Sequence, residues 1–161
     1  MKIVGDLAAR AGIDGAAMVA SLCMDWREIV ELSRHPLATI GAYTISHKML
    51  AKWPMGVARQ EMLGSKQRIE EKLGAPVRHF AYPVGDPTSA GAREFALAAE
   101  LGFASAATTR PGMIFPAHRG HLTALPRVSV NGNWQDGGYF EVLMSGAPFA
   151  LWNRGRRVNL G

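Results

Sequence analysis

The amino-acid sequence predicts an α/β fold in which parallel strands are flanked by outer helices. Short apolar segments at residues 77–82 and 103–108 alternate with longer segments of helical pattern. A strand, a helix and a second strand in this order form a right-handed crossover unit, which produces a parallel sheet. The chain has 161 residues and no internal repeat or low-complexity linker, so we expect a single domain over residues 1–161.

The first part of the chain is predicted to be mainly helical. Residues 6–24 are rich in alanine and glycine and predict one broken helix. Asp25 is placed to cap the next helix, because Glu28 follows it in the position of a capping box. His35-Pro36 ends that helix, since the residue before a proline is disfavoured in the helical region. Residues 37–44 then predict a short buried strand.

The remaining elements alternate between helices and strands. A helix over residues 57–73 is expected to end at Gly74, where a glycine C-cap belongs. The later elements are predicted as a strand at 77–82, a helix capped by Thr88 or Ser89 and running to Leu101, a strand at 103–108 and a strand at 128–130. In such sheets the functional groups gather on loops after the carboxyl ends of strands. Two loops qualify, residues 43–47 and residues 83–87.

Composition excludes several classes of function. The single cysteine, Cys23, rules out a disulfide framework and a cysteine-cluster zinc site, and we interpret it as a buried or half-buried apolar residue. The net charge is +5, but the basic residues are interleaved with acids, so we expect no nucleic-acid partner. No apolar run reaches the roughly 18 residues of a membrane span, and the N-terminus does not resemble a secretory signal. We therefore expect a soluble, cytoplasmic protein.

Two motifs carry a family resemblance. Residues 40–47 read Ile-Gly-Ala-Tyr-Thr-Ile-Ser-His, and residues 80–85 read Phe-Ala-Tyr-Pro-Val-Gly. The first resembles the metal-binding motif of NodB-type polysaccharide deacetylases, and the second resembles the Phe-x-x-Pro-Tyr-Gly motif of the same family. Leu125-Pro126-Arg127 also looks like the family, so the resemblance covers about residues 24–131. It implies an N-terminally truncated member, a partial NodB-type (β/α) barrel whose first strands are missing.

The resemblance also implies an activity. Members of the family are hydrolases of carbon–nitrogen bonds other than peptide bonds, and they remove acetyl groups from N-acetylated amino-sugar polymers. They use a divalent metal, usually zinc, held by one aspartate and two histidines, with a second aspartate as the base. By position, His47 corresponds to a metal ligand, Tyr43 replaces the other histidine, and the Val84 N–H corresponds to an oxyanion donor. Tyr82 and Pro83 then correspond to substrate-binding positions.

The chain departs from the family pattern at the metal site. A tyrosine phenol has an ordinary pKa of about 10, so Tyr43 is a poor zinc ligand at neutral pH. The paired-aspartate motif of the family is missing, because every aspartate is isolated in the sequence: Asp6, Asp14, Asp25, Asp86 and Asp136. We therefore predict that zinc is not tightly bound and that the hydrolase is inactive or severely impaired. His47 has two interpretations, a vestigial ligand or an ordinary loop histidine.

Other functions and contacts follow from the same residues. The fold can serve as a non-catalytic carbohydrate-binding or assembly module, or a second polypeptide can supply the aspartate motif. Missing strands expose a sheet edge that must pair or be covered, so we expect a homo-oligomer, with residues 139–152 as a candidate cover. Of the remaining polar and aromatic residues, we expect solvent-facing His118 and His121, a turn at Asp86, and partly buried Trp53, Trp134 and Trp152.

Overall fold

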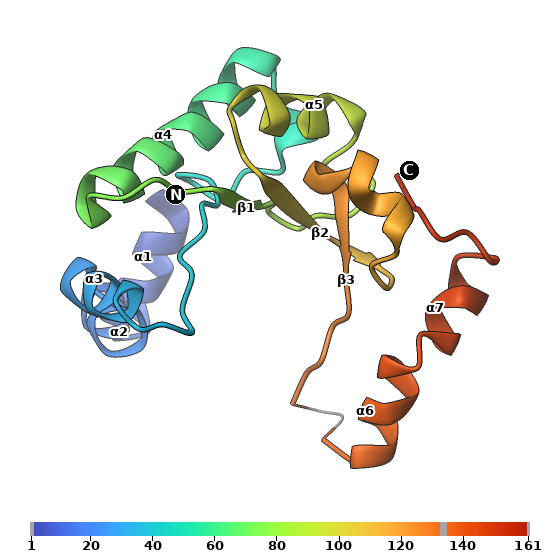
Figure 1. The fold of residues 1–161 in the computed structure, drawn as a ribbon. Coiled ribbons are helices and arrows are strands. Elements are labelled where there is room, and N and C mark those ends of the chain that lie inside the picture. Colours follow the sequence, from blue (N-terminus) through green and yellow to red (C-terminus); the bar gives the residue numbers. More distant parts are fainter. Residues whose placement is uncertain (1, 133–134, 161) are drawn as a thin grey trace. The chain divides into compact units, whose positions relative to one another are not determined.

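The computed structural model describes residues 2–132 and 135–160 (Figure 1). The chain divides into two compact units, Met1–Thr39 and Ile40–Gly161. Helices make up the first unit, and a parallel sheet with helices makes up the second. Trp134, which was expected to be partly buried, lies outside the described residues.

The first unit consists of α1 (Lys2–Arg10), α2 (Gly15–Leu22) and α3 (Trp26–Ser33). α1 and α2 confirm the predicted broken helix, and the break includes Gly12, which has a φ of 66°. The capping box of α3 is also confirmed. Glu28 N–H donates to the Asp25 carboxylate at 2.8 Å, and Asp25 N–H donates to the Glu28 carboxylate at 2.7 Å.

Many apolar side chains of the first unit are exposed. Cys23 is exposed at the C-cap of α2, so its prediction as a buried residue is wrong. The reason is that α2 has no buried residue, so the residue at its C-terminal end has no core to pack against.

None of the described helices is by itself long and apolar enough to cross a membrane. One bent pair, Ile3–Arg10 with Gly15–Ser33, meets that test only when its two parts are joined.

The second unit contains a parallel sheet and the helices that pack on it. Its elements are η1 (Leu50–Lys52), α4 (Met55–Leu73), β1 (His79–Ala81), α5 (Ala92–Glu100), β2 (Ser105–Pro111), η2 (Pro116–Gly120), η3 (Leu122–Ala124), β3 (Leu125–Arg127), α6 (Gly137–Met144) and α7 (Ala147–Trp152). The strands lie in the order β1-β2-β3 and all pairs are parallel. This confirms the α/β class, and Figure 1 shows α4 and α5 on one side of the sheet.

One face of the sheet forms the core with α4 and α5. The ring of Phe80 lies 5.1 Å from the ring of Tyr82 and 5.1 Å from that of Phe103, measured between centroids. Tyr82 also contacts Phe95 of α5 at 5.4 Å. Side chains alternate along β1, because Phe80 is buried while His79 is exposed on the other face.

The opposite face of the sheet is only partly covered. Its side chains are small or polar and are half-buried or exposed: His79, Ala81, Ser105, Ala107 and Thr109. His79 Nδ1 lies 2.8 Å from the Ser105 hydroxyl, which links β1 to β2 on this face. This face therefore presents small and polar side chains rather than a packed apolar core.

The segment before the sheet differs from its prediction. Residues 37–44 do not form a strand, and Leu37 is 90% exposed. Ala42 alone pairs with Phe80, in an isolated parallel bridge. The reason is that hydrogen bonds to β1 form only at Ala42, whose N–H donates to His79 O at 2.7 Å and whose carbonyl accepts from Ala81 N–H at 3.0 Å. The helix predicted at residues 57–73 is confirmed as α4, and Gly74 ends it with a φ of 64°.

Two later boundaries are also corrected. α5 begins at Ala92 rather than after Thr88 or Ser89. Glu94 accepts a hydrogen bond from Gly91 N–H at 2.9 Å, and this contact caps the helix instead. The predicted strand at residues 128–130 is displaced to β3 at Leu125–Arg127, where the carbonyl of Leu125 accepts a hydrogen bond from the Thr108 hydroxyl at 2.9 Å.

Side-chain predictions in the second unit have mixed outcomes. His118 is 2% exposed, so its prediction as a solvent-facing residue is wrong. Its Nδ1 accepts a hydrogen bond from Phe115 N–H at 3.0 Å, which satisfies the ring inside the fold. His121 is exposed, as predicted. Trp53 is 44% exposed, whereas Trp152 is 74% exposed because α7 has no buried residue, so the prediction for Trp152 is wrong.

Candidate functional site

Two loops emerge at the same edge of the sheet. The bridge between Ala42 and Phe80 is parallel, so residues 43–47 and residues 82–86 both follow the carboxyl end of a paired segment. Each loop holds a non-glycine residue at positive φ, His47 at 57° and Val84 at 62°. A β-branched residue is rare in that region, and such strain concentrates at functional sites. The structure thus brings the two motif loops together at one candidate site.

In the first loop, Tyr43 and His47 form a pair. The Tyr43 hydroxyl lies 3.2 Å from His47 Nε2, and the ring centroids are 5.3 Å apart. Tyr43 N–H donates to the Ser65 hydroxyl of α4 at 3.3 Å, which ties the start of the loop to that helix. The two residues at the predicted metal position are therefore neighbours, and the phenol lies within hydrogen-bond distance of one of the two ring nitrogens that could ligate a metal.

Glu61 of α4 anchors the middle of the first loop. Its carboxylate accepts hydrogen bonds from Ser46 N–H at 2.8 Å, from the Ser46 hydroxyl at 2.7 Å and from the Lys48 ammonium at 2.7 Å. Burial of Glu61 opposes its ionisation. The hydrogen bonds from Lys48 and Ser46 together outweigh burial and hold the pKa of Glu61 below its ordinary value. The loop that carries His47 is thus fastened to the helix by a buried, ionised carboxylate.

Sequence reasoning missed Glu61. α4 buries Ala58, Glu61, Met62 and Ser65, a spacing that places them on one face of a helix. A carboxylate on the inward face of an otherwise amphipathic helix needs a partner. A carboxylate on the inward face of the helix that follows a motif loop is therefore the sequence signal by which Glu61 could have been identified.

In the second loop, one exposed residue stands between two buried ones. Pro83 and Gly85 are buried, while Val84 is 42% exposed. The Val84 carbonyl accepts a hydrogen bond from the Thr109 hydroxyl at 2.6 Å, and no described residue accepts one from Val84 N–H. A Cβ on Gly85 would lie 2.7 Å from the backbone nitrogen of Thr109, so only glycine fits there. Among the described residues the Val84 N–H is thus without a partner, as an oxyanion donor must be before a substrate binds.

Tyr82 and Pro83, predicted at substrate-binding positions, are both buried. The Tyr82 hydroxyl donates to the Thr123 carbonyl at 2.8 Å, and burial raises the pKa of Tyr82. The Tyr82 ring therefore supports the loop from the core side, and neither residue exposes an appreciable surface. Asp86 forms the predicted turn, since its carboxylate accepts hydrogen bonds from Thr88 N–H and the Thr88 hydroxyl.

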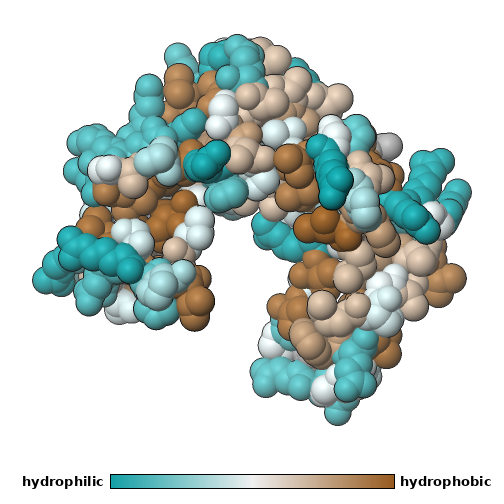
Figure 2. All heavy atoms as spheres, in the orientation of Figure 1, coloured by the Kyte–Doolittle hydropathy of each residue, from teal (hydrophilic) through white to brown (hydrophobic). Residues whose placement is uncertain are grey.

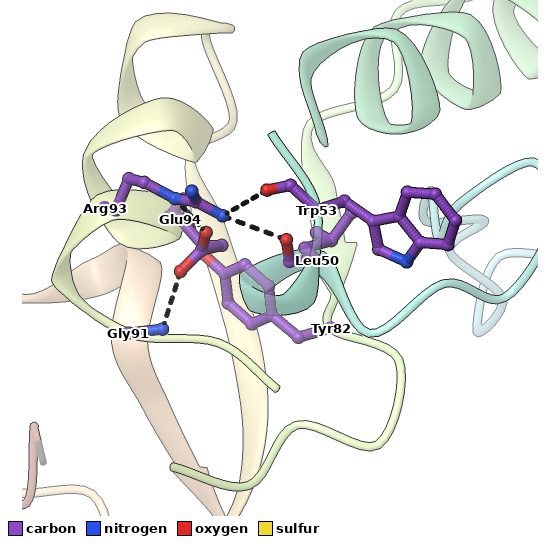
Figure 3. Close-up of polar contacts among 6 residues, drawn as sticks. All are labelled: Leu50, Trp53, Tyr82, Gly91, Arg93 and Glu94. Atoms are coloured by element: carbon purple, nitrogen blue, oxygen red, sulfur yellow. Dashed lines mark hydrogen bonds and ion pairs between the residues drawn. The ribbon is translucent and has the colours of Figure 1, made fainter. Parts of the chain in front are cut away.

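An ion pair on α5 fixes the segment that follows the first loop. Figure 3 shows Arg93 between Glu94 and the carbonyl groups of Leu50 and Trp53. Arg93 Nη2 donates to both carbonyls at 2.9 Å, and Arg93 Nε lies 2.6 Å from Glu94 Oε1. Glu94 is 2% exposed, so its charge needs this partner. The pair therefore holds η1 against α5 and limits how far the end of the first loop can move.

The described residues do not fit a three-ligand zinc site. Within residues 2–132 and 135–160, no group of three or more His, Cys, Asp or Glu side chains is placed to hold a metal ion. His47 Nε2 is engaged by the Tyr43 hydroxyl, and both carboxylate oxygens of Glu61 are engaged by Ser46 or Lys48. Zinc sites in proteins use at least three such ligands. These side chains therefore do not provide the set of ligands needed by the zinc ion that the family resemblance implies.

Known proteins resemble this chain in sequence and in fold. A family model described as polysaccharide deacetylase matches residues 7–105, more than half of the chain. The deacetylase PplD of Streptococcus pyogenes, solved in complex with acetate, has 21% sequence identity and a TM-score of 0.65 over 74% of this chain and 50% of that one. The deacetylase domain of BpsB from Bordetella bronchiseptica has 18% identity and a TM-score of 0.56 over 65% of this chain and 48% of that one. This chain thus spans about half the length of these two structures, and no curated protein matches it.

Proposed function

The chain belongs to the polysaccharide deacetylase family, and we propose that it recognises an acetylated amino-sugar polymer without hydrolysing it efficiently by itself. The family membership supports the class of ligand. The observation that carries the loss of activity is the 3.2 Å contact between the Tyr43 hydroxyl and His47 Nε2. This contact lies within residues 40–47, the segment that resembles the metal-binding motif of the family.

Acetyl removal needs an activated water as well as a place for the oxyanion. In the family, the metal acidifies the water and polarises the amide carbonyl. In this chain the Val84 N–H is available to stabilise an oxyanion. However, His47 is hydrogen-bonded to a phenol, and Glu61 is engaged by Ser46 and Lys48. An oxyanion donor without a base generates no nucleophile, so we expect at most slow hydrolysis.

Incubation of the full chain with an N-acetylglucosamine pentamer tests this proposal. We expect the pentamer to bind, while acetate release with added zinc stays at the level of a His47→Ala variant. His47 is exposed, so this substitution is a control that leaves the core intact. Acetate release by the wild type well above that level would contradict the loss of activity. Failure of the pentamer to bind would contradict the class of ligand.

A second candidate function is assembly with another chain that completes the site. β3 is an edge strand of the described sheet, and apolar side chains of α6 are exposed, among them Tyr139 at 53% and Val142 at 55%. Figure 2 shows hydrophobic residues on the surface of α6, which belongs to the segment that was predicted to cover an edge. Open edges and exposed apolar surface both favour association.

We expect a homo-oligomer at micromolar concentration, measured by static light scattering. A charge introduced on the apolar surface by Val142→Glu is expected to shift the equilibrium toward the monomer, because burial of an unpaired carboxylate is costly. Glu141→Gln is the matched control on the same helix and is expected to leave the molar mass unchanged. A monomeric wild type would contradict this prediction.

A further inference from the structure

A cavity of about 270 Å³ is lined in part by Thr109, whose hydroxyl contacts the second loop at Val84. Its wall includes Thr109, Arg127, Phe149 and Trp152, all of which lie beyond residue 105, where the match to the family model ends. We propose that this cavity binds one N-acetylated amino-sugar unit of the polymer, adjacent to the unit that contacts Val84. The inference rests on the proposed function, from which it takes the class of ligand.

Thr109 connects the cavity to the candidate site. Its hydroxyl donates to the Val84 carbonyl at 2.6 Å, and its backbone nitrogen is so close to Gly85 that a Cβ there would lie 2.7 Å away. The same residue lines the cavity and lies on the partly covered face of the sheet. A polymer that contacts Val84 can therefore extend past Thr109 into the cavity.

The wall of the cavity combines an aromatic platform with a free hydrogen-bond donor. Trp152 is 74% exposed, which is unusual because tryptophan is highly buried on average. Its indole offers a flat apolar face that matches the C–H face of a pyranose ring. Arg127 adds a guanidinium with five N–H donors, for which no acceptor is found among the described residues. Those donors suit the hydroxyl and acetamido oxygens of the sugar.

Hydrogen bonds hold the platform in place. Asn153, next to Trp152, donates from Nδ2 to the Pro111 carbonyl at the end of β2 at 2.9 Å. Asn159 Nδ2 donates in turn to Asn153 Oδ1 at 3.0 Å. These contacts fix the helix that carries Trp152 to the strand that carries Thr109. A platform on a fixed helix loses less entropy on binding than one on a mobile segment.

Calorimetric titration of the full chain with an N-acetylglucosamine pentamer tests the inference. We expect Trp152→Ala to weaken binding about threefold to tenfold, the range for loss of one aromatic contact. Leu151→Ala is the matched control, because Leu151 is its neighbour on α7, is 83% exposed and does not line the cavity. The control is expected to bind as the wild type does. Both positions are exposed, so neither substitution is expected to change the thermal unfolding.

A second measurement reports on Trp152 directly. The NMR resonance of its indole Nε1–H, assigned by its loss in Trp152→Phe, is expected to shift during the titration. If the wild type binds the pentamer but Trp152→Ala binds equally well and this resonance does not move, the inference is overturned and the proposed function stands. If the wild type does not bind the pentamer, the proposed function fails and the inference fails with it.

Discussion

Phe80→Ala is expected to lower the free energy of unfolding by about 3–5 kcal/mol. Phe80 is 3% exposed, and its ring packs against those of Tyr82 and Phe103. It is also the first residue of the second motif and the bridge partner of Ala42. The cavity left by the truncation therefore lies in the core beside the strand that leads into the second motif loop, and we expect that loop to loosen with the core. Urea denaturation of the full chain, followed by circular dichroism, measures the loss.

Ile114→Ala is the control for Phe80→Ala. Ile114 belongs to the same unit but is 65% exposed, so its truncation is expected to change the free energy of unfolding by no more than about 0.5 kcal/mol. Similar losses for the two variants would contradict the placement of the second motif in the core.

Glu61→Gln is expected to lower the free energy of unfolding by about 2 kcal/mol at neutral pH. The substitution keeps the size of the side chain but changes its hydrogen bonding. Ser46 contributes two donors to the carboxylate, and Lys48 contributes a third. A glutamine has one acceptor oxygen, and its amide N–H groups would face donors of Ser46 or Lys48. At least one of these contacts is therefore lost. We also expect faster hydrogen exchange at the Ser46 amide.

The pH dependence of stability follows from the same contacts. The pKa of Glu61 is lowered in the folded state, so the folded chain favours the ionised carboxylate. Its stabilising contribution is fully present above the ordinary pKa of a glutamate, about 4.3, and is lost as the pH falls through the lower folded-state pKa. We therefore expect the difference between wild type and Glu61→Gln to shrink below about pH 4 in acid denaturation curves.

Glu71→Gln separates this effect from a general loss of negative charge. Glu71 lies on the same helix, but its side chain is 73% exposed, and its carboxylate lies 3.8 Å from the Lys72 ammonium. Exposed pairs of this kind contribute little, so we expect a change of less than about 0.5 kcal/mol. If Glu71→Gln and Glu61→Gln had equal effects, the anchoring role of Glu61 would be refuted.

Elements with strong local signals were predicted correctly. The capping box of Asp25 and Glu28 depends on contacts within four consecutive residues, and the left-handed conformation of Gly74 depends on the absence of a side chain. The parallel sheet follows from the alternation of apolar and helical segments, so the fold class needs no knowledge of distant contacts. The two motif loops were located for the same reason, because each follows a paired segment.

Features that depend on distant partners were predicted less well. Residues 37–44 have strand character, but only Ala42 finds hydrogen-bond partners on β1. The burial of His118 and the hydrogen bonds of Glu61 to the first loop depend on how distant chain segments pack, which no short sequence pattern encodes. Tyr82 lies in a motif expected to bind substrate, yet its ring enters the core beside that of Phe80, because residues two apart in an extended segment face the same side.

Calorimetric titration of zinc into the full chain tests most directly the claim that the first loop does not form a metal site. The Tyr43 hydroxyl engages His47 Nε2, and the part of the chain that the structure describes places no group of three or more His, Cys, Asp or Glu side chains to hold a metal ion. We therefore predict that the wild type and His47→Ala give the same weak, non-saturating heat at neutral pH. A saturable complex of one zinc ion per chain that is abolished by His47→Ala would contradict the claim.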